Sequence, residues 1–267
     1  MSLKLCILAS SSSANCTYIS SGETSILIDA GLSARETTRR LEAIDVPIGA
    51  IDAICVSHEH ADHISGLRVL QRRHAIALYA NSGTLEAIGR IDGYDELQWR
   101  IFSTGSPFRI GNLTIEPFSV PHDAYEPVGF VVRDESVRIG IVTDIGIATE
   151  LVRQRLASCH TVVMEANYDD DLLKNSPRPW PLKQRIMGRQ GHLSNQHAAE
   201  MLTAIQSPTL SRVYLAHLSS DCNEPGLALK AMREGVAGTA AARIQVELTY
   251  PDRATEPWEV TGEPCRV

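Results

Sequence analysis

Short apolar runs and longer amphipathic segments alternate along this chain of 267 residues. The apolar runs are rich in β-branched residues and are bounded by Gly, Pro, Ser, Asn or Asp, which is typical of strands. They predict strands at 4–9, 16–20, 24–30, 53–57, 76–80, 113–120, 128–134, 137–144, 161–166, 212–217 and 244–250. Segments with apolar residues at helical spacing, several of which start with a serine suited to an N-cap, predict helices at 33–44, 65–74, 82–90, 148–158, 194–206 and 224–235.

The order of these elements predicts the fold class. Closely spaced strands in the first third suggest hairpins, whereas strands and helices alternate later. This order favours an α/β fold, with mixed sheets flanked by helices, over an all-β barrel or a purely parallel sheet. The length permits one large domain or two small ones, and because no clear linker is present we predict one domain spanning 1–267.

The composition is typical of a globular protein and argues against a membrane protein. With 43% hydrophobic and 21% charged residues, and no apolar run near 20 residues, a membrane span is not expected. The N-terminal run resembles a buried strand more than a signal peptide, so we expect a cytoplasmic protein. The six cysteines include no CxxC pair, so we expect mostly small core residues and neither a disulfide framework nor a cysteine zinc site.

Acidic residues and histidines recur where the predicted strands end. Taken singly, each is more typical of a turn or a structural residue. Together they suggest a site, because loops beyond strand ends present functional groups from a rigid sheet. The residues are Asp29, His58, His122, Asp144, Glu165 and His217.

The stretch SHEHADHISG, residues 57–66, carries the strongest chemical signal. It opens like the zinc-protease motif HExxH, but Asp62 stands where the second histidine is needed. Three imidazoles and a carboxylate this close together favour metal binding. Side chains two residues apart in an extended loop point the same way, so His58 and His60 are expected to bind one ion and Asp62 and His63 a second. Glu59 points away and is expected to be structural.

Each ion then needs ligands from elsewhere in the chain. His122 and His217 are the candidates to complete the two sets, and Asp144 is the candidate bridge because a carboxylate has two oxygens. The alternative for these three is a purely structural role. Nitrogen and oxygen ligands without a thiolate suit Zn²⁺, Mn²⁺ or Fe²⁺, so the expected cofactor is two divalent metal ions of open identity.

The motif HEHADH resembles the metal loop of the metallo-β-lactamase superfamily, whose fold is an αββα sandwich of two mixed sheets with a binuclear site at one sheet edge. LIDAG, VPH, VTD and LAH are similar, in order, to its successive motifs. This resemblance implies that Asp29 orients the metal loops by hydrogen bonding.

Other motifs narrow the resemblance. LASSSSANCTYI, PHDAYEPVGF, MEANYD, GHLSN and LAHLSSDCN resemble the YycJ (WalJ) family of cytoplasmic proteins, which implies 5′ to 3′ exonuclease activity on DNA. GHLSN and AHLSS also resemble the late histidine motifs of β-CASP nucleases. The large domain that those nucleases insert is missing here, because only 47 residues separate Asp144 from His192.

The predicted mechanism is hydrolysis at two bridged metal ions. Such a pair lowers the pKa of a shared water, and the resulting hydroxide attacks phosphorus. Asp62 and Asp144 are expected to orient it, and one or the other to accept its proton. Charge develops on the leaving oxygen, so a donor is needed opposite the metals. His192, at the start of the predicted helix 194–206, is our candidate.

Charge is unevenly distributed. The net charge of −7 argues against a general polyanion binder. The stretch 172–199 nevertheless has no acidic residue and five basic ones, which predict binding of phosphate groups and hence DNA as partner: Lys174, Arg178, Lys183, Arg185 and Arg189. Trp180 within it is either a base-stacking residue or a buried tryptophan in a solvated loop.

The remaining aromatic residues and histidines carry weaker signals. Tyr125 and Tyr168 lie near metal-loop motifs but are more typical of core residues, and His74, His160 and His197 are expected to be ordinary structural or surface residues.

Three functions from different classes therefore stay open. The first is a binuclear-metal phosphodiesterase acting on DNA ends. The second is a hydrolase of small thioesters, lactones or cyclic phosphodiesters at the same ions. The third is a metal-binding or regulatory module without turnover. The basic stretch beside His192 favours the first.

Overall fold

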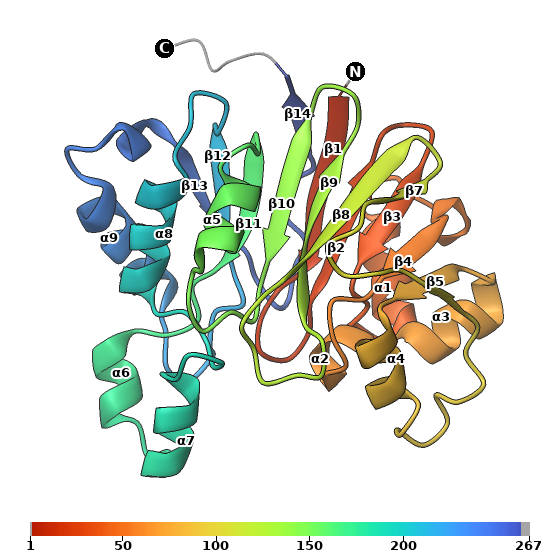
Figure 1. Cartoon of the computed structure of the whole chain (residues 1–267), viewed down its shortest axis with the longest axis horizontal. Helices are drawn as coiled ribbons and strands as arrows, with labels where there is room; N and C mark the ends of the chain where they lie inside the picture. Colours follow the sequence, from red (N-terminus) through yellow and green to blue (C-terminus); the bar gives the residue numbers. More distant parts are fainter. Residues whose placement is uncertain (1, 263–267) are drawn as a thin grey trace.

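Two stacked β-sheets form the centre of the protein, and helices cover the outer face of each (Figure 1). The computed structural model describes residues 2–262, and within this range each sheet has seven strands. Both sheets mix parallel and antiparallel pairs. The predicted α/β class and the sandwich of two mixed sheets are thereby confirmed.

The first sheet has the strand order β14-β1-β2-β3-β4-β5-β6. The strands β1, β2 and β3 form the predicted antiparallel hairpins, and β3, β4, β5 and β6 run parallel. Their bounds are β1 Ser2–Ala9, β2 Cys16–Ser20, β3 Ser25–Ile28, β4 Ala53–Cys55, β5 Ala77–Ala80, β6 Trp99–Ile101 and β14 Trp258–Thr261.

The second sheet has the order β13-β12-β11-β10-β9-β8-β7. Its first half in sequence is antiparallel, and β10, β11, β12 and β13 are parallel. Their bounds are β7 Phe108–Ile110, β8 Leu113–Ser119, β9 Val128–Arg133, β10 Arg138–Val142, β11 Thr161–Glu165, β12 Arg212–Ala216 and β13 Gln245–Leu248.

Helices cover each sheet on its outer side. The first sheet is covered by α1 Ala34–Glu42, α3 Leu67–His74 and α4 Ser82–Ile88, and the second by α5 Glu150–Leu156, α8 Asn195–Ile205 and α9 Pro225–Val236 (Figure 1). The short helices are α2 Ala61–Ile64, α6 Asp170–Asn175 and α7 Trp180–Ile186, with 3-10 turns at Ile48–Ala50 and Ala240–Arg243. No helix among the described residues is long and apolar enough to cross a membrane.

Three apolar layers hold these elements together. The middle layer joins the inner faces of the two sheets, for example Leu5 and Ile26 from one and Phe130 and Ile139 from the other. The outer layers lie between each sheet and its helices. The cysteines at 6, 16, 55, 159 and 222 are buried and free, as expected of core residues, and Cys265 lies outside the described residues.

The structure adds elements that the sequence pattern did not predict. The strands β6, β7 and β14 are short, and β6 lies at a sheet edge with two exposed residues, so no apolar run marked them. The prolines around 177–181 concealed α7, because Pro179 stands at its N-cap and Pro181 in its first turn, where a missing N–H costs nothing. Asn81 and Gly66, rather than the serines next to them, are the N-cap residues of α4 and α3.

Candidate metal centre

Strands from both sheets deliver the candidate site to one edge of the sandwich, where α2 lies in Figure 1. Parallel pairing aligns the carboxyl end of β3 with that of β4, and aligns those of β10, β11 and β12. The side chains at these ends therefore lie near one another. They are Asp29 after β3, the loop 57–66 after β4, Asp144 after β10, Glu165 at the end of β11 and His217 after β12.

The backbone turns sharply at three of these strand ends. Asp29, Asp144 and His217 have φ angles of 61°, 56° and 57°, in the left-handed region that few residues other than glycine adopt. Such backbone costs roughly 1–3 kcal/mol per residue and persists where the surrounding structure holds it. All three are buried and bonded to other site residues, so the strain directs functional side chains into the site.

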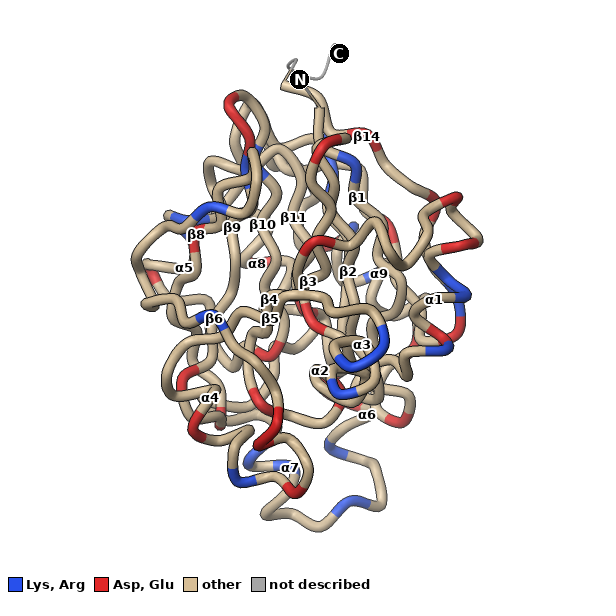
Figure 2. Tube along the Cα trace, turned by 90° about the vertical axis from the view of Figure 1, so that its right-hand side faces the viewer, with Lys and Arg blue, Asp and Glu red and all other residues tan. Residues whose placement is uncertain are grey.

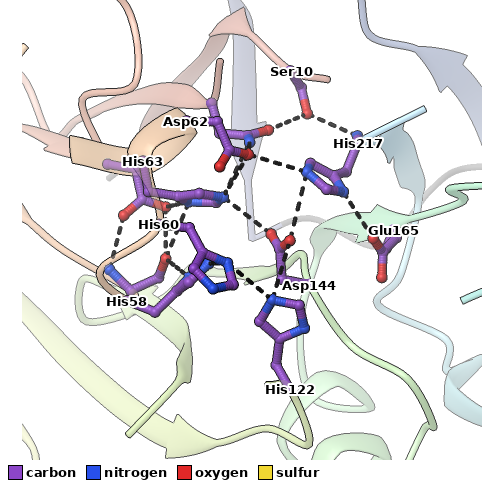
Figure 3. A network of polar contacts seen from close by, with 12 residues as sticks. Ser10, His58, His60, Asp62, His63, His122, Asp144, Glu165 and His217 are labelled. Atoms are coloured by element: carbon purple, nitrogen blue, oxygen red, sulfur yellow. Dashed lines mark hydrogen bonds and ion pairs between the residues drawn. The ribbon is translucent and has the colours of Figure 1, made fainter. Parts of the chain in front are cut away.

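The first group of ligand atoms consists of three imidazoles. His58 Nε2 lies 3.0 Å from His60 Nδ1, and His122 Nε2 lies 3.3 Å from the same atom (Figure 3). His58 and His122 are buried and His60 is partly exposed. The three nitrogens are close enough to share one metal ion.

The second group joins Asp62, His63 and His217. Asp62 Oδ2 lies 3.3 Å from His63 Nε2 and 3.4 Å from His217 Nε2. Asp144 stands between the two groups: Oδ2 is 3.1 Å from His63 Nε2, and Oδ1 is 3.5 Å from His217 Nε2 and 3.7 Å from His122 Nε2 (Figure 3). The structure thus brings together all seven residues proposed as ligands, and the groups overlap, since His58, His63 and Asp144 also lie close to one another.

Four of the five imidazoles are anchored through the ring nitrogen that faces away from the groups. His58 Nδ1 lies 3.0 Å from Ser57 Oγ, and His122 Nδ1 lies 3.2 Å from the carbonyl of Gly191. His63 Nδ1 lies 2.8 Å from Asp29, and His217 Nδ1 lies 2.8 Å from Glu165. Since carbonyls and carboxylates only accept, these Nδ1 atoms donate in the last three pairs, and when these rings are neutral Nε2 keeps its lone pair for a cation.

Asp29 is tied to the loop that carries the histidines. Its carboxylate accepts from the backbone N–H of Ser57 at 2.8 Å, from the Ser57 hydroxyl at 2.9 Å and from His63 Nδ1. Gly31 allows the same loop to approach, because a Cβ there would lie 1.6 Å from the carbonyl oxygen of Asp62.

The N-terminal loop supplies contacts that the sequence analysis did not assign. Asn15 Nδ2 donates to Asp62 Oδ2 at 3.1 Å and also lies 3.1 Å from His63 Nε2. Ser10 Oγ accepts from the backbone N–H of His217 at 2.8 Å and donates to Asn15 Oδ1 at 2.9 Å. The signal was the serine run at 10–13, which the sequence analysis did not connect to the histidines.

Glu165 is the other residue without an assigned role. It is fully buried, and its Oε1 accepts from Nδ1 of both His192 and His217 at 2.8 Å. Its Oε2 accepts from the backbone N–H groups of Ile145 and Leu193. Its position at a strand end, like that of Asp144, was the signal that could have found it. His192 lies beside the two groups with Nδ1 3.8 Å from Asp144.

Burial and neighbouring charge shift the pKa values here in opposite directions. Burial lowers the pKa of His58. Burial also lowers the pKa of His217 and His192, but neighbouring carboxylates outweigh it, raising that of His217 to about 10 and that of His192 above its ordinary value. Burial raises the pKa of Asp144, and the charge of His217 more than reverses this shift. The carboxylate therefore stays ionised at neutral pH, the state that binds a cation.

A pocket of about 230 Å³ opens over these groups. Two of the five basic residues of the stretch 172–199, Arg178 and Arg185, line it together with Leu182 and Ile186 of α7. Figure 2 shows several Lys and Arg positions near α7 at one end of the molecule. Arg178 pairs with Asp221 at 2.9 Å, and Arg185 pairs with Asp123, so each arginine is held beside the pocket.

The other basic residues lie differently. Lys183 is buried, and its ammonium donates to the carbonyl of Lys174 at 2.7 Å, so the expected contact with substrate phosphate is corrected for this residue. Lys174 is exposed but lies 3.8 Å from Asp170, at a separate hollow lined by acidic residues. Arg189 is exposed and is not among the residues lining the pocket.

The aromatic residues and Glu59 are placed as follows. Trp180 is 56% exposed, so the alternative of a buried tryptophan is wrong. Tyr125 is 53% exposed and has Arg90 over its ring, which corrects the expectation of a core residue, whereas Tyr168 is buried. Glu59 accepts from the backbone N–H of Tyr125 at 2.9 Å, a structural contact.

The three remaining histidines lie outside the two groups. His74 and His197 are exposed, and His160 is buried next to Arg138, whose N–H donates to it.

Comparison with known proteins agrees with this geometry. Residues 24–218 match the model of the β-lactamase superfamily domain. The chain is 34% identical to exodeoxyribonuclease YycJ of Bacillus anthracis over 85% of this chain and 87% of that protein, and 34% identical to exodeoxyribonuclease WalJ of Streptococcus pneumoniae over 96% and 98%. The structure of the metallo-β-lactamase fold protein YhfI from Bacillus subtilis superimposes with a TM-score of 0.74 at 15% identity, covering 97% of this chain and 100% of that one. The chain therefore belongs to the metallo-β-lactamase superfamily, and within it to the family of the YycJ and WalJ proteins.

Proposed function

We propose that this protein is a metal-dependent exodeoxyribonuclease, which hydrolyses phosphodiester bonds at DNA ends. The observation that carries the proposal is the pair of ligand groups meeting at Asp144 under a pocket lined by two arginines. The similarity to proteins named exodeoxyribonuclease supports DNA as the substrate.

The donor set fits two divalent cations. In the proposed arrangement His58, His60 and His122 would hold one ion, Asp62, His63 and His217 would hold the other, and Asp144 would serve both. Asp144 Oδ2 is buried and accepts no hydrogen bond from the described residues, as suits an oxygen that serves a cation. When bound, such ions lower the pKa of a water molecule and stabilise negative charge on phosphate oxygens.

The protein's own residues then position the reaction. Asp62 and Asp144 orient the attacking water, and one of them accepts its proton. The water oxygen bonds to phosphorus while the bond from phosphorus to the leaving sugar oxygen breaks. His192, held through Nδ1 by Glu165, has Nε2 free of partners among residues 2–262 and donates from it to that leaving oxygen.

The wall of the pocket engages the nucleic acid. Arg178 and Arg185 are partly or fully exposed and offer guanidinium groups to the phosphates that flank the scissile bond. Trp180 begins α7 between them and offers an exposed ring for stacking on a base. The partner is therefore DNA in this proposal, and Asp29 acts by orienting His63.

The test is an exonuclease assay with end-labelled duplex DNA and Mn²⁺ or Zn²⁺. The wild type should shorten the DNA, Asp62→Ala and His63→Ala should abolish shortening, and the exposed Asp95→Ala should behave as wild type. His192→Ala should keep the metal content and lose about 10²–10⁴ in turnover. Duplexes labelled at the 5′ end or at the 3′ end test the predicted 5′ to 3′ direction, since the 5′ label should be released first.

Three other results would contradict the proposal. Intact DNA together with hydrolysis of a thioester or lactone would make the protein a small-molecule hydrolase. Full metal content with no turnover of any phosphodiester would make it a binding module. Loss of metal in His192→Ala would show that His192 is a ligand and not a donor.

A further inference from the structure

A second hollow, of about 270 Å³, adjoins the candidate metal centre on the side of the N-terminal loop. We call it the serine pocket. Its walls come from three segments that are distant in sequence but meet here: the serine run at 10–13, the segment that follows His217 and the segment that follows β13. Residues that characterise it are Ser12, Leu218, Ser220, Pro225, Tyr250 and Pro251.

The serine pocket is continuous with the pocket over the metal centre. Ser12 and Ser219 line both of them. A molecule whose reacting phosphate lies among the ligand groups can therefore extend past these two serines into the serine pocket.

The two pockets differ in charge. The metal-centre pocket contains two arginines, four histidines and three aspartates, whereas none of the residues that line the serine pocket is charged. A phosphate is therefore favoured in the first and an uncharged group in the second. Hydroxyls beside the apolar surfaces of Leu218 and Pro225 suit a sugar and a base, which combine polar edges with flat apolar faces.

The size of the serine pocket limits what it holds. Its volume lies just under the range of roughly 300–1,000 Å³ typical of pockets for drug-sized ligands. One nucleoside matches this space, and a continuing duplex does not. A pocket for one nucleoside beside the reacting phosphate would select a DNA end over an internal bond.

The serine run is held rigidly relative to the ligand groups. Ser10 donates through its N–H to the Tyr250 carbonyl at 3.1 Å and accepts from the N–H of His217 at 2.8 Å. At the rim, Ser12 is exposed, and within residues 2–262 neither its N–H nor its hydroxyl donates to another residue. These two donors are available to a ligand that passes between the pockets.

We infer that the serine pocket binds the sugar and base of the 5′-terminal nucleotide while the phosphodiester on its 3′ oxygen lies at the metal centre. The inference rests on the proposed exonuclease function and specifies which part of the substrate is recognised apart from the reacting group. Ser12 is a positioning residue at the boundary of the two pockets.

The test blocks the rim without touching a ligand residue. In Ser12→Trp an indole fills the passage, and Ser106→Trp places the same side chain on an exposed loop beside the other sheet as the control. Two phosphodiesters are compared: the thymidine ester thymidylyl-(3′→5′)-thymidine, whose 5′-terminal nucleoside leaves through its 3′ oxygen, and methyl p-nitrophenyl phosphate, which has no nucleoside. Ser12→Trp should raise KM for the thymidine ester on the order of tenfold more than KM for the methyl ester, a difference of roughly 1.4 kcal/mol of binding.

Calorimetric binding of thymidine 3′-monophosphate and methyl phosphate to the Mn²⁺-loaded protein is the second measurement. Ser12→Trp should weaken the first about tenfold more than the second. Equal effects on both ligands, or the same effect from Ser106→Trp, would overturn the inference while leaving the exonuclease proposal intact. A wild type that hydrolyses neither ester nor DNA would overturn the proposed function, and the binding data would still decide the role of the pocket.

Discussion

Replacing Glu165 by glutamine tests how the protein controls its imidazoles. The carboxylate is fully buried and each of its oxygens has a separate task. Oε1 accepts from Nδ1 of His192 and His217, both at 2.8 Å, and Oε2 accepts from the backbone N–H groups of Ile145 at 2.9 Å and Leu193 at 3.1 Å. Glutamine has nearly the same shape but only one acceptor oxygen.

The backbone contacts decide which way the amide faces. If the amide NH₂ group faced the N–H groups of Ile145 and Leu193, three hydrogen-bond donors would meet without an acceptor. The amide oxygen should therefore face these N–H groups, and the NH₂ group should face the histidines. His217 must then accept at Nδ1, which moves its proton to Nε2 when the ring is neutral. Nε2 is the atom that lies 3.4 Å from Asp62 among the ligand groups, and a protonated nitrogen binds no metal.

The expected loss follows from that change of tautomer. Substituting an outer partner of a metal-bound histidine typically costs 10–100-fold in metal affinity, or about 1.4–2.7 kcal/mol. Glu165→Gln should therefore weaken the binding of one of two Mn²⁺ ions by this factor in calorimetry. Turnover should stay below that of the wild type even at saturating metal concentration, because His192 also loses its carboxylate partner.

A matched control separates this effect from the loss of a buried charge. Glu116 on β8 is also buried, and it pairs with Arg133 and Arg138 far from the site. Glu116→Gln should lower the melting temperature and leave both metal affinities unchanged. If Glu165→Gln binds two ions with wild-type affinity and hydrolyses DNA normally, the tautomer argument is wrong.

Three further predictions follow from contacts around the site and on the first helix. Asp29→Asn keeps a residue that tolerates a φ of 61° but puts an amide against His63 Nδ1, so metal affinity measured by calorimetry should fall on the order of tenfold; unchanged affinity would remove Asp29 from the site. Arg178→Ala and Arg185→Ala should each raise KM for DNA and reduce the slope of log K against log salt by about 1, without affecting methyl p-nitrophenyl phosphate; an unchanged slope would place the DNA elsewhere. Hydrogen bonds from Arg39 and then Arg40 lower the pKa of Glu36 to about 2. This carboxylate therefore stabilises the fold above pH 4.5, and its contribution is lost as the pH falls through 2. In urea unfolding, Glu36→Gln should be less stable than the wild type by roughly 1 kcal/mol at pH 7 and equally stable near pH 1. A difference that persists at low pH would contradict the ion-pair origin.

The sequence predicted those site residues that lie at recognisable spacings within a short segment or at the end of an apolar run. Side chains two residues apart in an extended loop point the same way, and this predicted that His58 and His60 lie together, separate from the pair Asp62 and His63. The strand ends at Asp144 and His217 could be added because parallel strands end at one edge. The sheets themselves were predictable because their central strands are apolar runs, whereas β6, β7 and β14 are too short to form one.

Contacts between distant segments were beyond the sequence pattern. Glu165 anchors histidines 27 and 52 residues away, and nothing in VVMEA distinguishes an anchoring acid from one that ends a strand. The basic stretch looked uniform as a string of letters, but α7 turns Arg185 toward the pocket and buries Lys183 against the carbonyl of Lys174. Orientation on a helix separates such neighbours, and prolines around residues 177–181 had hidden that helix.

Packing between the two sheets sets the distance between the two halves of the candidate site. His58 and His63 follow a strand of the first sheet, whereas Asp144 and His217 follow strands of the second. Ile28, which precedes Asp29, and Ala216, which precedes His217, both lie in the apolar layer between the sheets. Because close-packed interiors resist even small changes in volume, that layer fixes how far apart the two sets of ligand atoms stand. The motif in residues 57–66 supplies the ligand atoms of one sheet, and the apolar residues of both sheets determine whether those atoms meet their partners.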